Sequence, residues 1–165
     1  FCLSRGLGDV YKRQVQGMVQ QSQIDHNAHM HDADYNYIFS DAINQFNYTH
    51  GLSLAERQAL HYTIFTVEEH TTYLAEMSLG EHYIIQLFIY NYDDKRIHFF
   101  LKLIKENGTL AATNEVMMLG IDSTTRKAAA FPEPYFTEMT SYYKTQDISQ
   151  WPKQLGHQIG IPNKG

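Results

Sequence analysis

A single apolar stripe over residues 35–46 limits the possible folds more than any other feature of this sequence. Its members recur at helical spacing, at positions 0, 3, 4, 7, 8 and 11 of the stretch: Tyr35, Ile38, Phe39, Ala42, Ile43 and Phe46. Such spacing places all of them on one side of an α-helix. Asp32 or Asp34 can cap the start of this helix, and Gly51 can end it. At about 1.5 Å per residue the helix spans roughly 24 Å, which is enough to cross a small sheet.

After this helix, apolar residues recur with a period of two, which indicates β-strands. A short helix over 54–60 comes first, where Ser53 and Glu56 can form a capping box. The expected strands cover 15–24 before the long helix and 62–73, 83–92, 96–105 and 109–121 after it, and a terminal helix covers 135–144. We therefore expect an α+β fold, in which a curved antiparallel sheet of about five strands wraps around one long central helix.

The length of 165 residues suits one domain. We expect this domain over 15–132, followed over 133–165 by a C-terminal helix and a flexible tail that is poorly ordered from Trp151. Residues 1–14 begin with Phe and show little periodicity, so we expect them to be a non-native N-terminal extension. This extension contains Cys2, the one cysteine of the sequence, so we expect no disulfide framework in the domain.

The charge and hydropathy of the chain argue against two classes of partner. A formal net charge of -5 disfavours binding to nucleic acid or to an anionic membrane surface. No apolar run approaches the roughly 20 residues that a membrane-spanning helix needs. We expect a cytoplasmic protein that binds neither nucleic acid nor membrane.

A cluster of titratable side chains, D-H-N-A-H-M-H-D-A-D over 25–34, leads directly into the long helix. The exposed backbone N–H groups of a helix start, here around 31–34, favour negative charge and can polarise a carbonyl group. The same cluster contains candidate metal ligands, namely His26, His29, His31, Asp32 and Asp34. Because H-x-x-H-x-H is not a recognised ligand spacing, we expect no metal site.

The pattern D-x-N-x-H-M, here Asp25, Asn27, His29 and Met30, followed by Tyr35, resembles the opening motif of hot-dog fold acyl-CoA thioesterases of the 4-hydroxybenzoyl-CoA thioesterase type. The segments 65–80, 95–100 and 111–118 are similar to the branch associated with carnitine catabolism and betainyl-CoA. The resemblance covers roughly 15–132. Many members have glycine where this chain has Ala28, a residue that a positive φ would strain.

The resemblance implies roles for the residues of the motif. Asp25 matches the acid that serves as nucleophile or general base, and Asn27 and His29 would orient the carbonyl or the water. The alternatives are that Asp25 only caps a turn and that the other two only bond the loop backbone. Tyr35 is expected to contact substrate.

A second group of candidates lies on the predicted strands. Glu68 and His70 match the E-x-H of the family, and alternation places them on one strand face with Thr66, opposite Phe65 and Val67. The resemblance implies that the pair assists catalysis across a dimer, whereas a solvated surface is the alternative. Further candidates on later strands are Glu115 and a basic face that can meet a CoA phosphate, formed by Arg96, His98 and Lys102. The alternative for the basic face is an ordinary exposed surface.

Together these features predict an acyl-CoA thioesterase that hydrolyses a small acyl-CoA thioester, with betainyl-CoA implied by the resemblance. We expect a homodimer or a dimer of dimers, and no cofactor, since coenzyme A belongs to the substrate. The alternatives are a hot-dog module that binds acyl groups or CoA without turnover, and a metal-dependent hydrolase.

Overall fold

The computed structural model describes residues 14–162. Apart from Gln14, the predicted non-native extension with its Cys2 lies outside the described residues. Among residues 14–162, no helix combines the length and the apolar character that crossing a bilayer requires.

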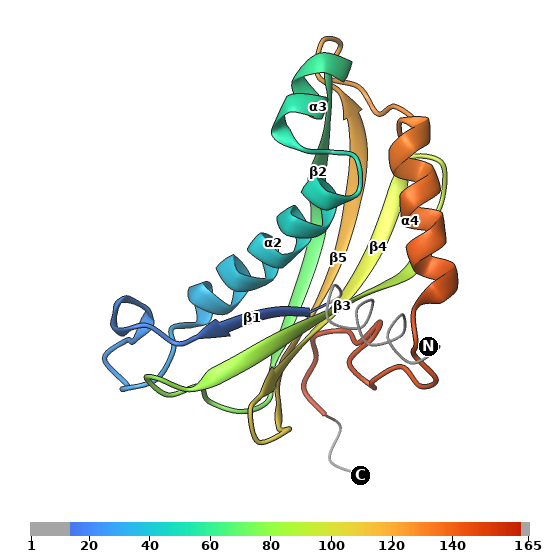
Figure 1. Cartoon of the computed structure of the whole chain (residues 1–165). Coiled ribbons are helices and arrows are strands. Elements are labelled where there is room, and N and C mark those ends of the chain that lie inside the picture. Colours follow the sequence, from blue (N-terminus) through green and yellow to red (C-terminus); the bar gives the residue numbers. More distant parts are fainter. Residues whose placement is uncertain (1–13, 163–165) are drawn as a thin grey trace, which may run out of the picture.

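Five strands form one antiparallel sheet in the spatial order β1-β3-β4-β5-β2 (Figure 1). Their bounds are Gln14–Met18 for β1, Tyr62–Tyr73 for β2, His82–Tyr92 for β3, Arg96–Lys105 for β4 and Leu110–Asp122 for β5. The helices are α2 (Asp32–Thr49), α3 (Leu54–Leu60) and α4 (Glu133–Thr145). The predicted α+β fold, with a curved sheet around one long helix, is confirmed.

The apolar stripe of α2 is buried against one face of the sheet. All six of its members are at most 6% exposed: Tyr35, Ile38, Phe39, Ala42, Ile43 and Phe46. Alternate residues of the central strands, such as Ile85 on β3 and Phe99 on β4, are fully buried in the same core. Each buried large side chain contributes roughly 1.5–3 kcal/mol. The position of α2 across the sheet is therefore fixed by its apolar stripe.

The start of α2 differs from the sequence-based expectation. The N-cap is His31, and neither Asp32 nor Asp34 takes that position. The Nδ1 atom of His31 accepts a hydrogen bond from the backbone N–H of Ala33 at 3.1 Å. Both aspartates lie in the first turn, where their negative charge is favourable beside the helix N-terminus.

The strand predicted over 15–24 is shorter than expected. It ends at Met18, and the chain then forms the short 3₁₀ helix η1 (Gln21–Gln23). The side chain of Gln23 accepts a hydrogen bond from the N–H of Gln20 at 2.8 Å. Because local amide bonds of this kind compete with a β-ladder, the strand stops before this glutamine-rich segment.

A β-bulge between Thr66 and Glu68 changes which side chains of β2 share a face. Thr66 pairs with the buried Met118, whereas Glu68 pairs with Met117 on the opposite face of β5. The prediction that Thr66 lies on the same face as Glu68 and His70 was therefore wrong. Simple alternation fails because a bulge inserts one extra residue and reverses the order of faces beyond it.

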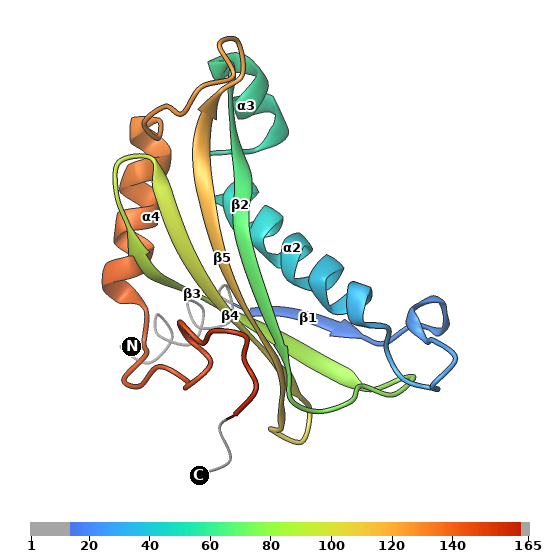
Figure 2. The same ribbon diagram turned by 180° about the vertical axis from the view of Figure 1, so that it is seen from behind.

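The helix α4 packs on the same face of the sheet as α2, and the chain then crosses to the other face (Figures 1 and 2). The hydroxyl of the buried Tyr135 on α4 donates to Oδ1 of Asn47 on α2 at 2.8 Å. Beyond α4, the side chain of Gln146 bonds both the N–H of Ile89 (2.9 Å) and its carbonyl oxygen (2.7 Å) at an edge of β3.

The tail beyond Gln146 lies on the outer face of the sheet, which faces away from α2. The ring of Trp151 contacts those of Phe88, Tyr90 and Phe100 at centroid distances of 6.2, 5.1 and 6.0 Å. The N–H of Gly156 donates to Oε2 of Glu115 at 2.8 Å. These contacts hold the tail against the sheet at Trp151 and Gly156, whereas Ile159 and Ile161 beyond them are 91% and 95% exposed. The expectation of a poorly ordered tail stays a prediction.

Candidate active site

Backbone hydrogen bonds hold the loop over 25–31 against the loop that precedes β3. The N–H of Asp25 donates to the carbonyl oxygen of His29 at 3.0 Å, and that of Ala28 donates to the carbonyl oxygen of Asp25 at 3.1 Å. The N–H of Met30 donates to the carbonyl oxygen of Met77 at 2.8 Å. Ala28 has a φ of 64°, which lies in the left-handed region where glycine is favoured. The loop is therefore closed tightly, at the cost of a strained backbone at Ala28.

The carboxylate of Asp25 is held by Asn27. Its Oδ1 accepts the backbone N–H of Asn27 at 2.7 Å, and its Oδ2 accepts the side-chain amide at 3.3 Å. Desolvation, the largest single influence, raises the pKa of Asp25, but the two bonds from Asn27 and the charges of His29 and His26 together hold it below its usual value. Asp25 thus caps a turn, which was the structural alternative considered for it. In the same position it presents an ionised carboxylate at neutral pH.

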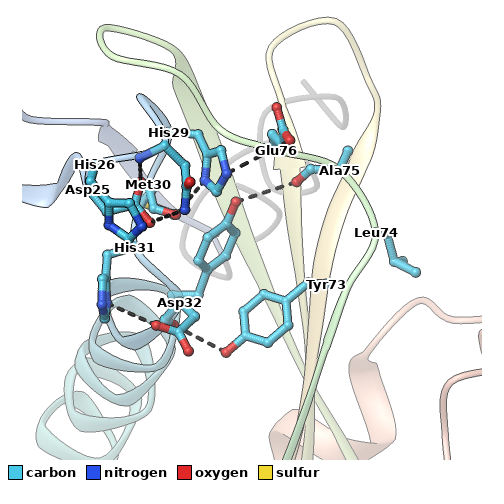
Figure 3. A pocket seen from close by; sticks show the side chains of 12 residues that line it. Asp25, His26, His29, Met30, His31, Asp32, Tyr73, Leu74, Ala75 and Glu76 are labelled. Carbon is cyan, nitrogen blue, oxygen red and sulfur yellow. Dashed lines mark hydrogen bonds and ion pairs between the residues drawn. The ribbon is translucent and has the colours of Figure 1, made fainter.

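A pocket of about 560 Å³ opens beside this carboxylate (Figure 3). Its walls come from the loop, from the start of α2 and from the end of β2 with the residues after it: Asp25, His26, Asn27, His29, Met30, His31, Asp32, Tyr35, Tyr73, Leu74, Ala75 and Glu76. The lining contains three carboxylates, from Asp25, Asp32 and Glu76, and neither lysine nor arginine. We call this the Asp25 pocket.

Two tyrosines form the floor between the two walls of the Asp25 pocket. Tyr35 and Tyr73 meet edge to face, with ring centroids 5.2 Å apart. The hydroxyl of Tyr35 accepts the N–H of Met77 at 3.1 Å and donates to the carbonyl oxygen of Ala75 at 3.4 Å. Burial raises the pKa of Tyr35. Because its hydroxyl is fully engaged, Tyr35 presents a ring and not a hydroxyl to the pocket.

The wall formed by residues 73–76 was not predicted from the sequence. The hydroxyl of Tyr73 donates to the carbonyl oxygen of Asp32 at 3.2 Å, and Oε1 of Glu76 lies 3.8 Å from Nε2 of His29. In Figure 3 the side chain of Tyr73 points toward Asp32 at the start of α2 and Glu76 lies opposite His29, whereas Leu74 points away from the pocket. No local motif marks these residues, since contacts between distant parts of the chain, such as the bond between Met30 and Met77, bring them to the loop.

Most of the backbone donors expected at the start of α2 are already occupied. The N–H of His31 donates to Gln23 at 2.9 Å, and that of Asp34 donates to His31 at 3.0 Å. The N–H of Ala33 has acceptors in His31 and Asp32, at 3.1 and 2.9 Å. Within residues 14–162, the N–H of Asp32 is the donor of this turn without such a partner. It is the group best placed to bond a developing oxyanion.

Within one chain, the structure does not bring the strand candidates to the Asp25 pocket. The lining contains none of Thr66, Glu68, His70, Arg96, His98 or Lys102. Thr66 instead lines a cavity of about 300 Å³ between α2 and β2, which also contains Glu69.

The outer-face candidates have partners of their own. Nε2 of His98 lies 2.7 Å from Oε1 of Glu115, and Nε of Arg96 donates to Asp93 at 2.7 Å. The ammonium of Lys102 lies over the ring of Phe88, 5.1 Å from its centroid, and burial lowers its pKa. Two of the three basic side chains expected to meet a CoA phosphate are therefore engaged by a carboxylate, and the third is packed on a ring.

The histidine-rich loop does not assemble a metal centre in this structure. His26, His29 and His31 all line the Asp25 pocket. Among the described residues, however, no three side chains of the metal-binding types are grouped as ligands. The expectation of no metal site stays a prediction for the protein in solution.

Comparison with known proteins connects this geometry to one family. The sequence profile of the thioesterase-like superfamily matches residues 19–152. The L-carnitine dehydrogenase/betainyl-CoA thioesterase of Agrobacterium fabrum is 29% identical over 136 residues, which are 82% of this chain and 28% of that protein. The chain thus spans less than a third of that relative. The betainyl-CoA thioesterase of Pseudomonas aeruginosa is 26% identical over 140 residues, which are 84% of this chain and 88% of that protein.

A solved structure is closer in sequence than either of these relatives. A Staphylococcus aureus protein, determined in complex with CoA, is 59% identical and superimposes with a TM-score of 0.90. The alignment covers 91% of this chain and 95% of that one.

Proposed function

The chain belongs to the thioesterase-like superfamily, as its opening motif predicted, and from this premise we propose that it hydrolyses a small acyl-CoA thioester to a free acid and coenzyme A. The observation that carries the proposal is the ionised carboxylate of Asp25, held by Asn27 at the mouth of a preformed pocket. The relatives named as thioesterases and the CoA complex of the Staphylococcus aureus relative support it.

The reaction needs a group that delivers an oxygen nucleophile to the thioester carbon. As a general base, Asp25 takes a proton from water while the water oxygen bonds to the carbonyl carbon. The carbonyl oxygen becomes an oxyanion, which the N–H of Asp32 stabilises. The intermediate then collapses, the C–S bond breaks, and the thiolate of coenzyme A takes up a proton.

A second route uses the same residues. In this route a carboxylate oxygen of Asp25 attacks the carbonyl carbon directly, and the thiolate leaves. Water then hydrolyses the resulting anhydride and regenerates the carboxylate. In both routes His29 and Asn27 orient the reacting groups. Hydrolysis in oxygen-18 water under single-turnover conditions tests the second route, because label enters Asp25 only when an anhydride forms and water attacks its aspartyl carbon.

The lining of the Asp25 pocket favours an acyl group that carries a positive charge. Asp32 and Glu76 contribute carboxylates, Tyr35 and Tyr73 contribute rings, and no lysine or arginine is present. Aromatic faces attract quaternary ammonium groups, and carboxylates strengthen that attraction. A betainyl group, a trimethylammonium attached to a short acyl chain, fits this chemistry. We propose betainyl-CoA as the substrate.

The free edge of β2 supports the proposal that the protein works as a homodimer. This strand has 12 residues and ends the sheet, and Phe65 and Val67 on it are 38% and 55% exposed. An exposed edge of this length tends to pair with a second strand. Two-fold pairing of β2 with its copy places the partner strand beside Tyr73, at the wall of the Asp25 pocket.

Replacing one carboxylate tests the proposed catalytic role. We expect Asp25→Asn to lower kcat/KM for betainyl-CoA by about 10²–10⁴-fold, because the amide can neither attack the thioester nor accept the proton. The matched control is Asp41→Asn, on the part of α2 outside the pocket, which should stay within twofold of the wild type. A folded Asp25→Asn protein that turns over within threefold of the wild type would show that this residue is not the base or nucleophile.

The choice of substrate separates the proposal from its alternative, a module that binds CoA thioesters without turnover. Wild-type protein is assayed with betainyl-CoA and with the uncharged acetyl-CoA and butyryl-CoA. Hydrolysis that is fastest for betainyl-CoA supports the cationic acyl group. Binding of all three thioesters without release of free thiol would favour the non-catalytic module.

A further inference from the structure

Three aromatic side chains from separate parts of the chain converge on a second cavity, distinct from the Asp25 pocket. Tyr90 comes from β3, Tyr143 from α4, and Trp151 from the tail that follows α4. The cavity measures about 650 Å³ and shares no lining residue with the Asp25 pocket. Small-molecule sites typically measure about 300–1,000 Å³. We call this cavity the Trp151 pocket.

The rings of the Trp151 pocket are held in place by other rings. Trp151 meets Tyr90 edge to face at 5.1 Å, and Tyr143 meets Tyr92 at 5.2 Å. The tail is anchored nearby, where the amide of Gln146 bonds both backbone groups of Ile89. Because these contacts set the positions of the rings in advance, a ligand that stacks on them does not have to order them.

The Trp151 pocket is lined by a positively charged side chain, whereas the Asp25 pocket is lined by carboxylates. Lys144 is the one charged residue in its lining, beside the amides of Asn91 and Gln146. Lys144 is exposed, and it has no ion-pair partner among the residues that the structure describes. A free ammonium beside aromatic rings suits a flat ring system that carries a phosphate.

We propose that the Trp151 pocket binds an adenine nucleotide, with the purine on the aromatic rings and a phosphate on Lys144. Adenine offers a flat π-face for stacking and ring nitrogens for the amide of Asn91. The phosphate supplies the negative charge that Lys144 lacks among residues 14–162. This chemistry could come from the nucleotide end of coenzyme A or from a free adenine nucleotide.

Within one chain, the Trp151 pocket lies far from the Asp25 pocket, where thioester hydrolysis is proposed. The Asp25 loop is bonded to Met77, just before β3 begins, whereas Tyr90 lies near the end of that strand. From His82 to Tyr90 the strand extends roughly 26 Å. The nucleotide site therefore does not rest on the proposed hydrolytic function, and it can be tested by binding alone.

Trp151 provides a direct probe, because it is the one tryptophan in the sequence. The fluorescence of the full chain is titrated with AMP, with coenzyme A and with pantetheine, which lacks the nucleotide, and calorimetry repeats each titration. We expect saturable quenching and measurable heat for AMP and coenzyme A, and neither for pantetheine. Tighter binding of coenzyme A identifies it as the source of the nucleotide, whereas tighter binding of AMP identifies a free nucleotide.

Two variants at exposed lysines test the contact with phosphate. Lys144→Gln should weaken AMP binding by roughly tenfold, the effect of losing one charge-assisted hydrogen bond. Lys153→Gln, on the same tail but outside the lining, should leave the dissociation constant within twofold. Adenosine, without a phosphate, should bind both variants equally. Failure of AMP and coenzyme A to bind at millimolar concentration, or equal AMP binding by Lys144→Gln and wild type, would overturn the proposal.

Discussion

Ala28 offers a test of the strained loop, because changing it to glycine should stabilise the protein. A non-glycine residue in the left-handed region costs about 1–2 kcal/mol, and Ala28 has a φ of 64° there. Glycine removes this strain but adds freedom to the unfolded chain, which opposes the gain by about 0.4–1 kcal/mol. The hydrogen bond from its N–H to Asp25 stays, since glycine keeps that group. The expected net gain is about 0.5–1 kcal/mol.

The assay is equilibrium unfolding in urea at pH 7, with thermal unfolding as a second measurement. For a chain of this size, the gain corresponds to a rise in Tm of about 1–4 °C. The matched control is Ala55→Gly, the same chemical change at an exposed position of α3. There the helix is weakened, and stability should fall by about 0.5–1 kcal/mol.

The two substitutions should therefore act with opposite signs, and hydrolysis by Ala28→Gly should stay within twofold of the wild type. A loss of stability in Ala28→Gly similar to that in Ala55→Gly would refute the reasoning. In that case Ala28 would not be held at positive φ in solution, and the path of the Asp25 loop would differ from the one described.

Three further predictions concern assembly, metal and pH. Co-refolding Asp25→Asn with Glu68→Gln chains, each inactive alone, should restore activity if the two residues meet across a dimer; hybrid dimers that stay inactive would show that they do not. Dialysis against a chelator should leave hydrolysis unchanged, and loss of activity that zinc or iron restores would contradict the metal-free mechanism. Desolvation raises the pKa of Asp93, but hydrogen bonds from Arg96 and from the N–H of Lys95 lower it to about 2. A folded-state pKa below the unfolded value gives stability above about pH 4 that is lost as the pH falls toward 2. Asp93→Asn should therefore flatten the pH dependence of unfolding in that window.

The parts of the fold that depend on local periodicity were predictable. The stripe of α2 and the alternation in the later strands each reflect the requirement that one face be buried, and this requirement acts within a short window of sequence. The capping box at Ser53 and Glu56 is equally local, and the structure contains both of its bonds. These elements could be predicted without knowing which residues they pack against.

The site could be predicted only in part, because one of its walls is made by tertiary contacts. The loop motif located Asp25, Asn27 and His29, which line one pocket. Nothing near Tyr73 or Glu76 in the sequence indicates that they form the facing wall, because the Met30–Met77 bond joins segments far apart in the chain.

The faces of β2 were mispredicted for a different reason. A bulge depends on how one strand is paired with its neighbour, here β2 with β5, and leaves no mark in the alternation of a single strand. Thr66 therefore lies on the α2 side of the sheet, where sequence reasoning could not have put it.

Two strand segments without a neighbour, the part of β3 beyond its pairing with β1 and the edge strand β2, differ in their capacity to recruit other chains. At Ile89 on β3, the amide of Gln146 occupies both the donor and the acceptor that a foreign strand would need. Along β2, the backbone past the bulge and the side chains of Phe65 and Val67 stay accessible. A growing fibril needs two unpaired strand edges on every subunit. One edge pairs with the preceding subunit and the other pairs with the next. In the proposed homodimer the two-fold pairing uses β2 of both copies, and Gln146 blocks that stretch of β3, so neither of these two segments remains open to a further chain.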